Sequence, residues 1–398
     1  MNKTLLMSKC RSHFRGVTVW VTPGYLSRQQ YFPANPATAH YFCASSVLAP
    51  RRSQRDPISA AARRMLVAFL VPSFLAPFSD TVRGAHGQTV GAHPGQPVAS
   101  VPVEDTLTRA KVRLGQEVFF DRDLSSDRTV SCADCHSPQR AFTDGAKTSQ
   151  GVHRIQGRRN SPTLVNVGLQ PLYFWDGRAS SLEDQALGPL FDPGEMGMSR
   201  EELISRLASK PVYPVLFQQA FPDGLSVDNV VNCLAAFQRT ILSLNSAYDR
   251  YQAGDPQILS PLARRGMDLF FGKAHCSLCH RGVNFSDGLF HNLGVGWTGD
   301  GFSDLGRFLV TGVPADRGAF RTPTLRQVAQ TAPYMHDGSL ETLQDVVEWY
   351  DRGGVSNPHI DPLIQPLRLT SPEKKALLAF LMALSGTVSS GISSSPSP

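Results

Sequence analysis

Apolar residues recur at helical spacing along most of the chain beyond residue 105. Six segments carry this pattern: 106–119, 199–209, 227–243, 261–271, 340–350 and 371–385. Spacings of three and four residues place apolar side chains on one face, so each segment is predicted to be a helix packed against a core. The predicted fold class is therefore mainly α.

Two long stretches between these helices have no periodic pattern. Residues 137–172 and 281–335 are punctuated by glycine and proline, which favours loops over regular elements. Loops of this length are uncommon in compact domains unless they serve a function such as wrapping a cofactor. The 398-residue length leaves room for two domains. We place their boundary near residue 255, giving domains at 104–255 and 256–385.

Charge separates the first 87 residues from the rest of the chain. Residues 1–87 hold 11 of the 39 Lys and Arg but only 2 of the 33 Asp and Glu, so the remaining residues have a balance of −3. The overall charge of +6 thus belongs to a leader, and a basic surface for nucleic acid is not indicated.

The leader has the composition of a secretory signal. Residues 65–78 (MLVAFLVPSFLAPF) are uncharged and follow Arg63 and Arg64, and small residues come shortly after. Fourteen residues are too few for a membrane span, which needs about 20. A buried helix of the main domain is the alternative. We expect a leader at 1–87, a flexible lead-in at 88–103, a periplasmic mature protein without a membrane span, and a disordered tail at 386–398.

Four of the seven cysteines fall into two identical frames. These are Cys132-Ala-Asp-Cys135-His136 and Cys276-Ser-Leu-Cys279-His280, 144 residues apart. C-x-x-C-H is the attachment signature of c-type haem, in which two thiols hold the macrocycle and the histidine binds iron. A closed zinc site would need a fourth ligand, and a thioredoxin-like pair would need a βαβ context that is missing here. The sequence predicts two covalent haem c groups, one in each domain.

Further motifs follow each frame in a constant order. They are 157–165 (GRRNSPTLV) and 174–178 (FWDGR) after the first, and 320–326 (FRTPTLR) and 331–338 (TAPYMHDG) after the second. Over residues 104–385 the chain resembles the bacterial dihaem cytochrome c peroxidase family, which includes the MauG enzymes of methylamine utilisation. The resemblance implies that the first haem is the peroxidatic one and that the second relays electrons. It also implies that Trp175 lies between the two haems; an ordinary core aromatic is the alternative.

Cleavage of the peroxide O–O bond needs a group that takes a proton from one oxygen and delivers it to the other, which a carboxylate of suitable pKa can do. Glu195, ten residues after Gln185, matches the spacing of the family's distal glutamate and glutamine. We therefore expect Glu195 to act as acid and base and Gln185 to position peroxide. The resemblance further implies a calcium ion held by Asn160, Thr331 and Pro333.

Two residues in positions that bind haem iron in this family indicate which branch of the family the chain resembles. Tyr350 stands fourteen residues after His336, where typical peroxidases have methionine and MauG-type members have tyrosine. It is therefore the expected distal ligand of the second iron, whose other expected protein ligand is His280. Its alternative is a residue capping a helix. His153 lies in the loop where typical peroxidases carry a histidine that blocks the first iron, but it is one residue out of register. It is either a gating ligand or an exposed loop histidine.

These features predict a periplasmic dihaem peroxidase that reduces hydrogen peroxide to water with electrons from a small cytochrome c or cupredoxin. One rival is a MauG-like enzyme that oxidises residues of a partner protein, and another is a dihaem electron carrier without chemistry at either iron. Glu195 and Gln185 argue against the carrier, because a carrier needs no distal acid and base. A homodimer is compatible with this reading.

Overall fold

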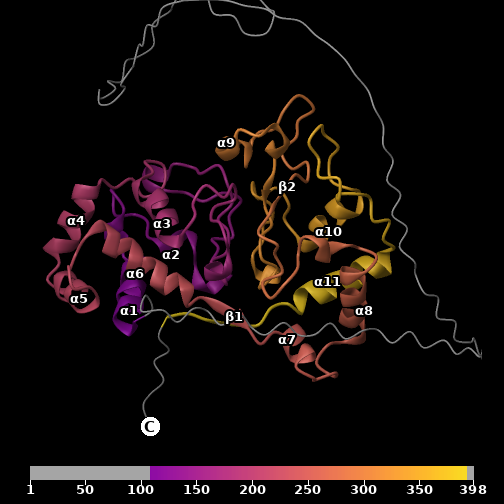
Figure 1. The fold of residues 1–398 in the computed structure, drawn as a ribbon, viewed down its shortest axis with the longest axis horizontal. Helices are drawn as coiled ribbons and strands as arrows, with labels where there is room; N and C mark the ends of the chain where they lie inside the picture. Colours follow the sequence, from indigo (N-terminus) through magenta and orange to yellow (C-terminus); the bar gives the residue numbers. More distant parts are fainter. Residues whose placement is uncertain (1–107, 392–398) are drawn as a thin grey trace, which may run out of the picture. The chain divides into compact units, whose positions relative to one another are not determined.

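The computed structural model describes residues 108–391. The predictions for the leader and for the lead-in at 88–103 concern residues outside this range. The described chain is mainly helical, which confirms the predicted fold class (Figure 1). No helix within it is long and apolar enough to cross a bilayer.

Helices of the first half surround one core. They are α1 (Arg109–Phe120), α2 (Cys132–Cys135), α3 (Leu182–Phe191), α4 (Arg200–Ser209), α5 (Val212–Ala220) and α6 (Val227–Arg239). Helices α1 and α6 pack so closely that a Cβ atom on Gly115 would lie 1.8 Å from the carbonyl oxygen of Cys233. Glycine is therefore required at this crossing, and Cys233 is fully buried as a small apolar residue.

The second half repeats this arrangement around its own core. Its helices are α7 (Ala247–Gln252), α8 (Pro261–Phe271), α9 (Phe308–Thr311), α10 (Leu343–Asp351) and α11 (Ser371–Met382). Helices α8 and α11 cross at Gly266, where a Cβ atom would lie 1.9 Å from the carbonyl oxygen of Ala376. In each half, the helix that precedes the cysteine frame thus packs through a glycine on a helix later in the chain.

The two halves contact each other through matching backbone positions. The Asn160 amide donates to the carbonyl of His336 at 2.7 Å, and the Arg321 amide donates to the carbonyl of Trp175 at 2.8 Å. Arg321 belongs to β3 (Phe320–Arg321), which pairs antiparallel with β2 (Phe290–His291). These reciprocal bonds fix the loop of each half against the loop of the other.

A second strand pair joins the end of the first half to the C-terminal segment. Strand β1 (Leu242–Leu244) pairs antiparallel with β4 (Thr387–Ser389), as Figure 1 shows between the two groups of helices. Two predictions are wrong here. The helix predicted over 227–243 ends at Arg239, and residues 387–389 of the tail predicted to be disordered form a strand, because Thr387 and Val388 extend readily along the edge of β1.

Candidate active site

The first cysteine frame forms the short helix α2. Asp134 holds it in place, since its carboxylate accepts from the Ser131 amide at 2.7 Å and pairs with Arg122 at 2.6 Å. The Nδ1 atom of His136 lies 3.1 Å from the carbonyl oxygen of Phe142. A carbonyl can only accept, so Nδ1 carries the proton and Nε2 keeps the lone pair that a metal requires.

The second frame repeats this arrangement. The Nδ1 atom of His280 lies 2.9 Å from the carbonyl oxygen of Phe285. Burial lowers the pKa of both His136 and His280, which keeps the two imidazoles neutral and suited to bind iron. In both halves a loop carbonyl thus orients the imidazole that the C-x-x-C-H motif supplies.

The four frame cysteines are free thiols. Burial raises the pKa of Cys132 to about 12, that of Cys135 to about 11 and that of Cys276 to about 12. Two pairs of free thiols, each beside a neutral histidine on the wall of a cavity, fit covalent haem in both halves.

The first cavity brings together the residues predicted for peroxide chemistry. Gln185 and Pro189 lie four residues apart on α3 and so share one helix face, which lines this cavity. His136 lines the same cavity. Glu195 follows α3 in a loop and lines the same cavity. Glu195 is an exposed residue of the cavity wall, yet desolvation by the surrounding protein raises the pKa of its carboxyl, with a smaller contribution from the charge of Asp192.

His153 lies away from this cavity. Its side chain is 65% exposed and its Nδ1 atom is 3.5 Å from a carboxylate oxygen of Asp127, which also accepts from the His153 amide at 2.8 Å. Its neighbours Gly151 and Ile155 line the cavity, whereas His153 does not. The structure thus has His153 as an exposed loop residue, and its ligation of the first iron stays a prediction.

Trp175 lines both cavities. Its side chain is 9% exposed, and its indole N–H donates to the carbonyl of Asn160 at 2.8 Å. A fixed indole on the wall of both cavities is suitably placed for electron transfer between the groups that the cavities hold.

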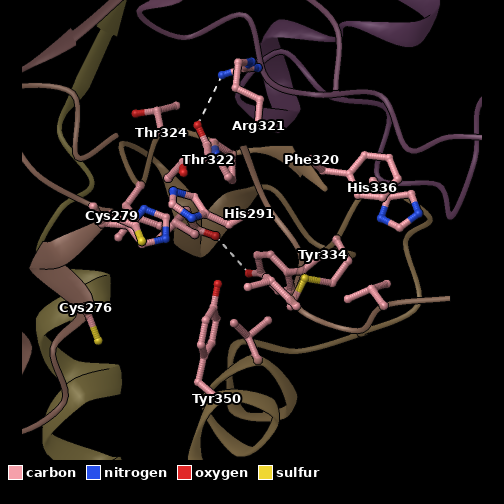
Figure 2. Close-up of a pocket in the computed structure, with 18 of the residues that line it drawn as sticks. Cys276, Cys279, His291, Phe320, Arg321, Thr322, Thr324, Tyr334, His336 and Tyr350 are labelled. Atoms are coloured by element: carbon pink, nitrogen blue, oxygen red, sulfur yellow. Dashed lines mark hydrogen bonds between the residues drawn. The ribbon is translucent and has the colours of Figure 1, made fainter. Parts of the chain in front are cut away.

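The second cavity contains Tyr350, which α10 presents next to the second frame. Figure 2 shows its hydroxyl pointing toward the group that includes Cys279 and His291. Burial raises the pKa of the phenol, and the nearby thiols of Cys276 and Cys279 add to the effect. Without a cation the phenol stays neutral, and a ferric iron would supply the charge that favours phenolate.

The residues predicted for calcium line one cavity. Asn160, Thr331 and Pro333 all line the second cavity. The Asn160 side-chain amide donates to the carbonyl of Ala146 at 2.9 Å, and this bond leaves the Asn160 side-chain oxygen as an acceptor. Oxygen ligands of this kind suit a hard cation, and the calcium ion itself stays a prediction.

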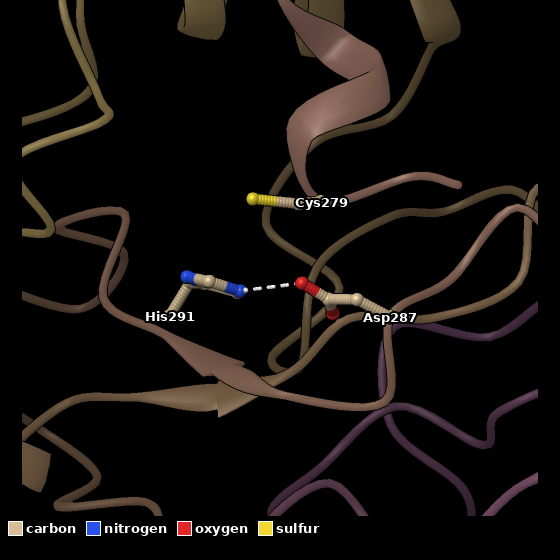
Figure 3. A group of neighbouring side chains, drawn as sticks. All are labelled: Cys279, Asp287 and His291. Carbon is tan, nitrogen blue, oxygen red and sulfur yellow. Dashed lines mark hydrogen bonds and ion pairs between the residues drawn. The ribbon is translucent and has the colours of Figure 1, made fainter. Parts of the chain in front are cut away.

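Sequence reasoning missed an ionic group beside the second frame. The Nδ1 atom of His291 lies 2.6 Å from a carboxylate oxygen of Asp361. Its Nε2 atom lies 3.2 Å from a carboxylate oxygen of Asp287 (Figure 3). A hydrogen bond with Cys279, followed by those with the two carboxylates, raises the pKa of His291 to about 10. The ligand atoms of Cys279, Asp287 and His291 lie within 4.8 Å of one another, as a metal site would require. Cys279 belongs to the haem-attachment frame, however, so its sulfur is committed to the macrocycle.

Comparison with known proteins identifies the family. The family model described as di-haem cytochrome c peroxidase matches residues 109–257. Methylamine utilization protein MauG of Methylorubrum extorquens is 39% identical, over 71% of this chain and 80% of its own. The chain belongs to the dihaem cytochrome c peroxidase and MauG family.

Two further relatives agree with this family assignment. Cytochrome-c peroxidase IdrP1 of Denitromonas iodatirespirans is 38% identical, over 73% of this chain and 85% of its own. The crystal structure of a MauG-like protein associated with microbial copper homeostasis superposes with a TM-score of 0.67 at 36% identity, over 76% of this chain and 96% of that one. As a member of this family the chain is a peroxidase-type oxidoreductase with haem cofactors, which confirms the enzyme class implied by the resemblance and the haem predicted from the C-x-x-C-H frames.

Proposed function

We propose that the protein is a periplasmic peroxidase that reduces hydrogen peroxide to water with electrons from a small cytochrome c or cupredoxin. One peroxide molecule takes two electrons and two protons and gives two water molecules. The observation that carries this proposal is the first cavity, where Gln185 and Glu195 share the wall with His136.

In this proposal the bound haem supplies the iron that binds peroxide and the electrons that break its O–O bond. Glu195 moves the proton: its carboxylate accepts a proton from the inner peroxide oxygen and returns it to the outer oxygen, which leaves as water. The raised pKa of Glu195 brings its acid and base forms closer in population near neutral pH, as this shuttle requires. The Gln185 amide orients peroxide, because it can donate to one oxygen and accept from the other.

Electron supply is the role we assign to the second half. His280 and Tyr350 bind the second iron, and the indole of Trp175 lies on the route between the two cavities. Residues 1–87 have the composition of a secretory signal, so we propose that the mature protein is exported to the periplasm.

The test is a turnover assay on the purified dihaem protein. A reduced small cytochrome c is mixed with hydrogen peroxide, and oxidation of the cytochrome is followed together with loss of peroxide. We expect two cytochrome molecules oxidised per peroxide consumed. A cytochrome oxidation rate that does not depend on peroxide would overturn the proposal.

Tyr350 favours a second candidate function, the MauG-like oxidation of residues on a partner protein. A phenolate ligand stabilises ferric and more oxidised iron, whereas a methionine stabilises the ferrous relay of a peroxidase. Peroxide added to the fully ferric protein distinguishes the two. A long-lived oxidised species that forms without prior reduction supports the MauG-like function, and reactivity only after partial reduction supports the peroxidase.

A further inference from the structure

Arg321 is a buried arginine on the walls of both cavities. It is 3% exposed and belongs to the short strand β3. Its backbone amide donates to the carbonyl of Trp175, so the position of Arg321 is fixed relative to the indole that lies between the two cavities. Figure 2 shows its side chain at the edge of the second cavity, close to Thr322.

The guanidinium of Arg321 has only neutral partners. Its Nε atom donates to the carbonyl of Phe174 and its Nη1 atom to the carbonyl of Thr322, both at 3.3 Å. Among residues 108–391 no carboxylate forms an ion pair with it. Burial lowers the pKa of Arg321 to about 10, so the side chain still carries its charge at neutral pH.

Two other arginines, the partly buried Arg159 and the buried Arg326, show the ordinary arrangement. Arg159 pairs with Asp176 and with Asp304 at 2.6 and 2.7 Å. Arg326, five residues after Arg321, pairs with Asp249 at 2.7 Å. A buried cation without a counter-ion is strongly unfavourable, so the exception at Arg321 indicates that an anion completes this site.

A second polar atom of the same region lacks a partner. The Nε2 atom of His336 is buried and has no hydrogen-bond partner among the described residues. Its ring stacks on Phe320, the residue before Arg321, with 3.5 Å between ring centroids. His336 also lines the second cavity, so the wall of this cavity offers two groups that could donate to an anion.

We infer that Arg321 is the counter-ion for haem propionates at the junction of the two cavities. Each haem c carries two propionate carboxylates, and the planar guanidinium can donate to a carboxylate through two parallel N–H groups. This inference depends on the two haem cofactors and not on the peroxide reaction proposed above. A fixed positive charge at this place favours the ferrous state, and it therefore raises the reduction potential of the haem whose propionates it binds.

The test compares the reduction potentials of both haems in four dihaem proteins: the wild type, Arg321→Gln, Arg321→Lys and Arg317→Gln. Arg317 lies outside both cavities, where its side chain stacks on Phe308, and it serves as the matched control. Spectroelectrochemical titration gives the potentials, and haem content and thermal unfolding are measured on each protein.

We expect Arg321→Gln to weaken one-electron reduction of at least one haem by about tenfold in equilibrium constant, or 59 mV. A unit charge roughly 10 Å from another at an effective dielectric constant of about 20 has an effect of this size. The propionates of that haem should also take up protons at higher pH in this variant, because loss of a nearby positive charge raises the pKa of a carboxyl group, and the potential should then depend more strongly on pH. Arg321→Lys should keep most of the wild-type potential, and Arg317→Gln all of it.

Unchanged potentials of both haems in a folded Arg321→Gln protein would overturn the inference. If Arg321→Gln does not accumulate with two haems, Arg321→Lys still tests it, because the propionate bending bands in resonance Raman spectra report hydrogen bonding at these carboxylates. Shifted bands in Arg321→Lys, with unshifted bands in Arg317→Gln, support the inference, and unshifted bands in both overturn it. Peroxide turnover plays no part in either readout.

Discussion

Replacement of Glu195 by glutamine tests the proton shuttle. Glutamine has nearly the same size as glutamate and keeps an acceptor oxygen, but it cannot exchange a proton, so the change removes chemistry and leaves the cavity wall in place. Loss of a positioned acid and base group slows reactions by typically 10²–10⁴-fold. This corresponds to about 2.7–5.4 kcal/mol of activation free energy, at 1.36 kcal/mol for each factor of ten.

The raised pKa of Glu195 adds a pH signature. Only the carboxylate form can accept the proton of peroxide, so the wild-type rate should fall as the pH drops through the pKa of Glu195. This fall should occur above the ordinary glutamate value of 4.5. The Glu195→Gln protein should lack this acid limb, because its amide does not titrate in this range.

The assay is steady-state oxidation of a reduced small cytochrome c by peroxide at several pH values. Glu201→Gln is the control, since Glu201 is an exposed carboxylate in the first turn of α4 and does not line the cavity. Its rate should equal that of the wild type. A Glu195→Gln protein that turns over at the wild-type rate, with the same pH profile, would refute the assignment of Glu195 as the proton shuttle.

Three further changes test other parts of the site and the fold. His136→Gly should abolish peroxide turnover and leave the optical spectrum of the second haem intact; retained turnover would show that peroxide reacts elsewhere. Tyr350→Met should raise the potential of the second haem and introduce the sulfur-to-iron band at the red end of the ferric spectrum, and a Tyr350→Phe spectrum identical to the wild type would exclude phenolate ligation. Gly266→Ala should destabilise the protein by about 1–3 kcal/mol or more, because its Cβ would lie 1.9 Å from a carbonyl oxygen of α11. Thermal unfolding measures this loss against Gly301→Ala, whose Cβ would meet no atom within 4 Å.

The helices beside the cysteine frames could be predicted from the sequence because apolar periodicity is strong in them. The segment 261–271 coincides with α8, and 371–385 begins at the first residue of α11. Helix α3 was not predicted as an element, although Gln185 lies on it. Its run of leucine and alanine is interrupted by Pro189, so the periodic signal is weak.

The arrangement of the site depends on contacts between segments far apart in the sequence. The loop that carries His153 bends through a left-handed conformation at this residue, with φ of 54°, and its side chain leaves the cavity. Nothing local in the sequence determines that direction. The isolation of Arg321 from carboxylates, in contrast to Arg326 in the same motif, likewise depends on which loops meet at β3.

The division of labour between the two haems is the central claim, and electron paramagnetic resonance of the fully ferric protein tests it most directly. The account predicts a high-spin signal from the first haem, which changes when an exogenous ligand such as azide is added, and a low-spin signal from the second haem, which does not. A first haem that stays low-spin and ignores added ligand in both the fully ferric and the half-reduced protein would contradict the account, because its iron would then have no position open to peroxide.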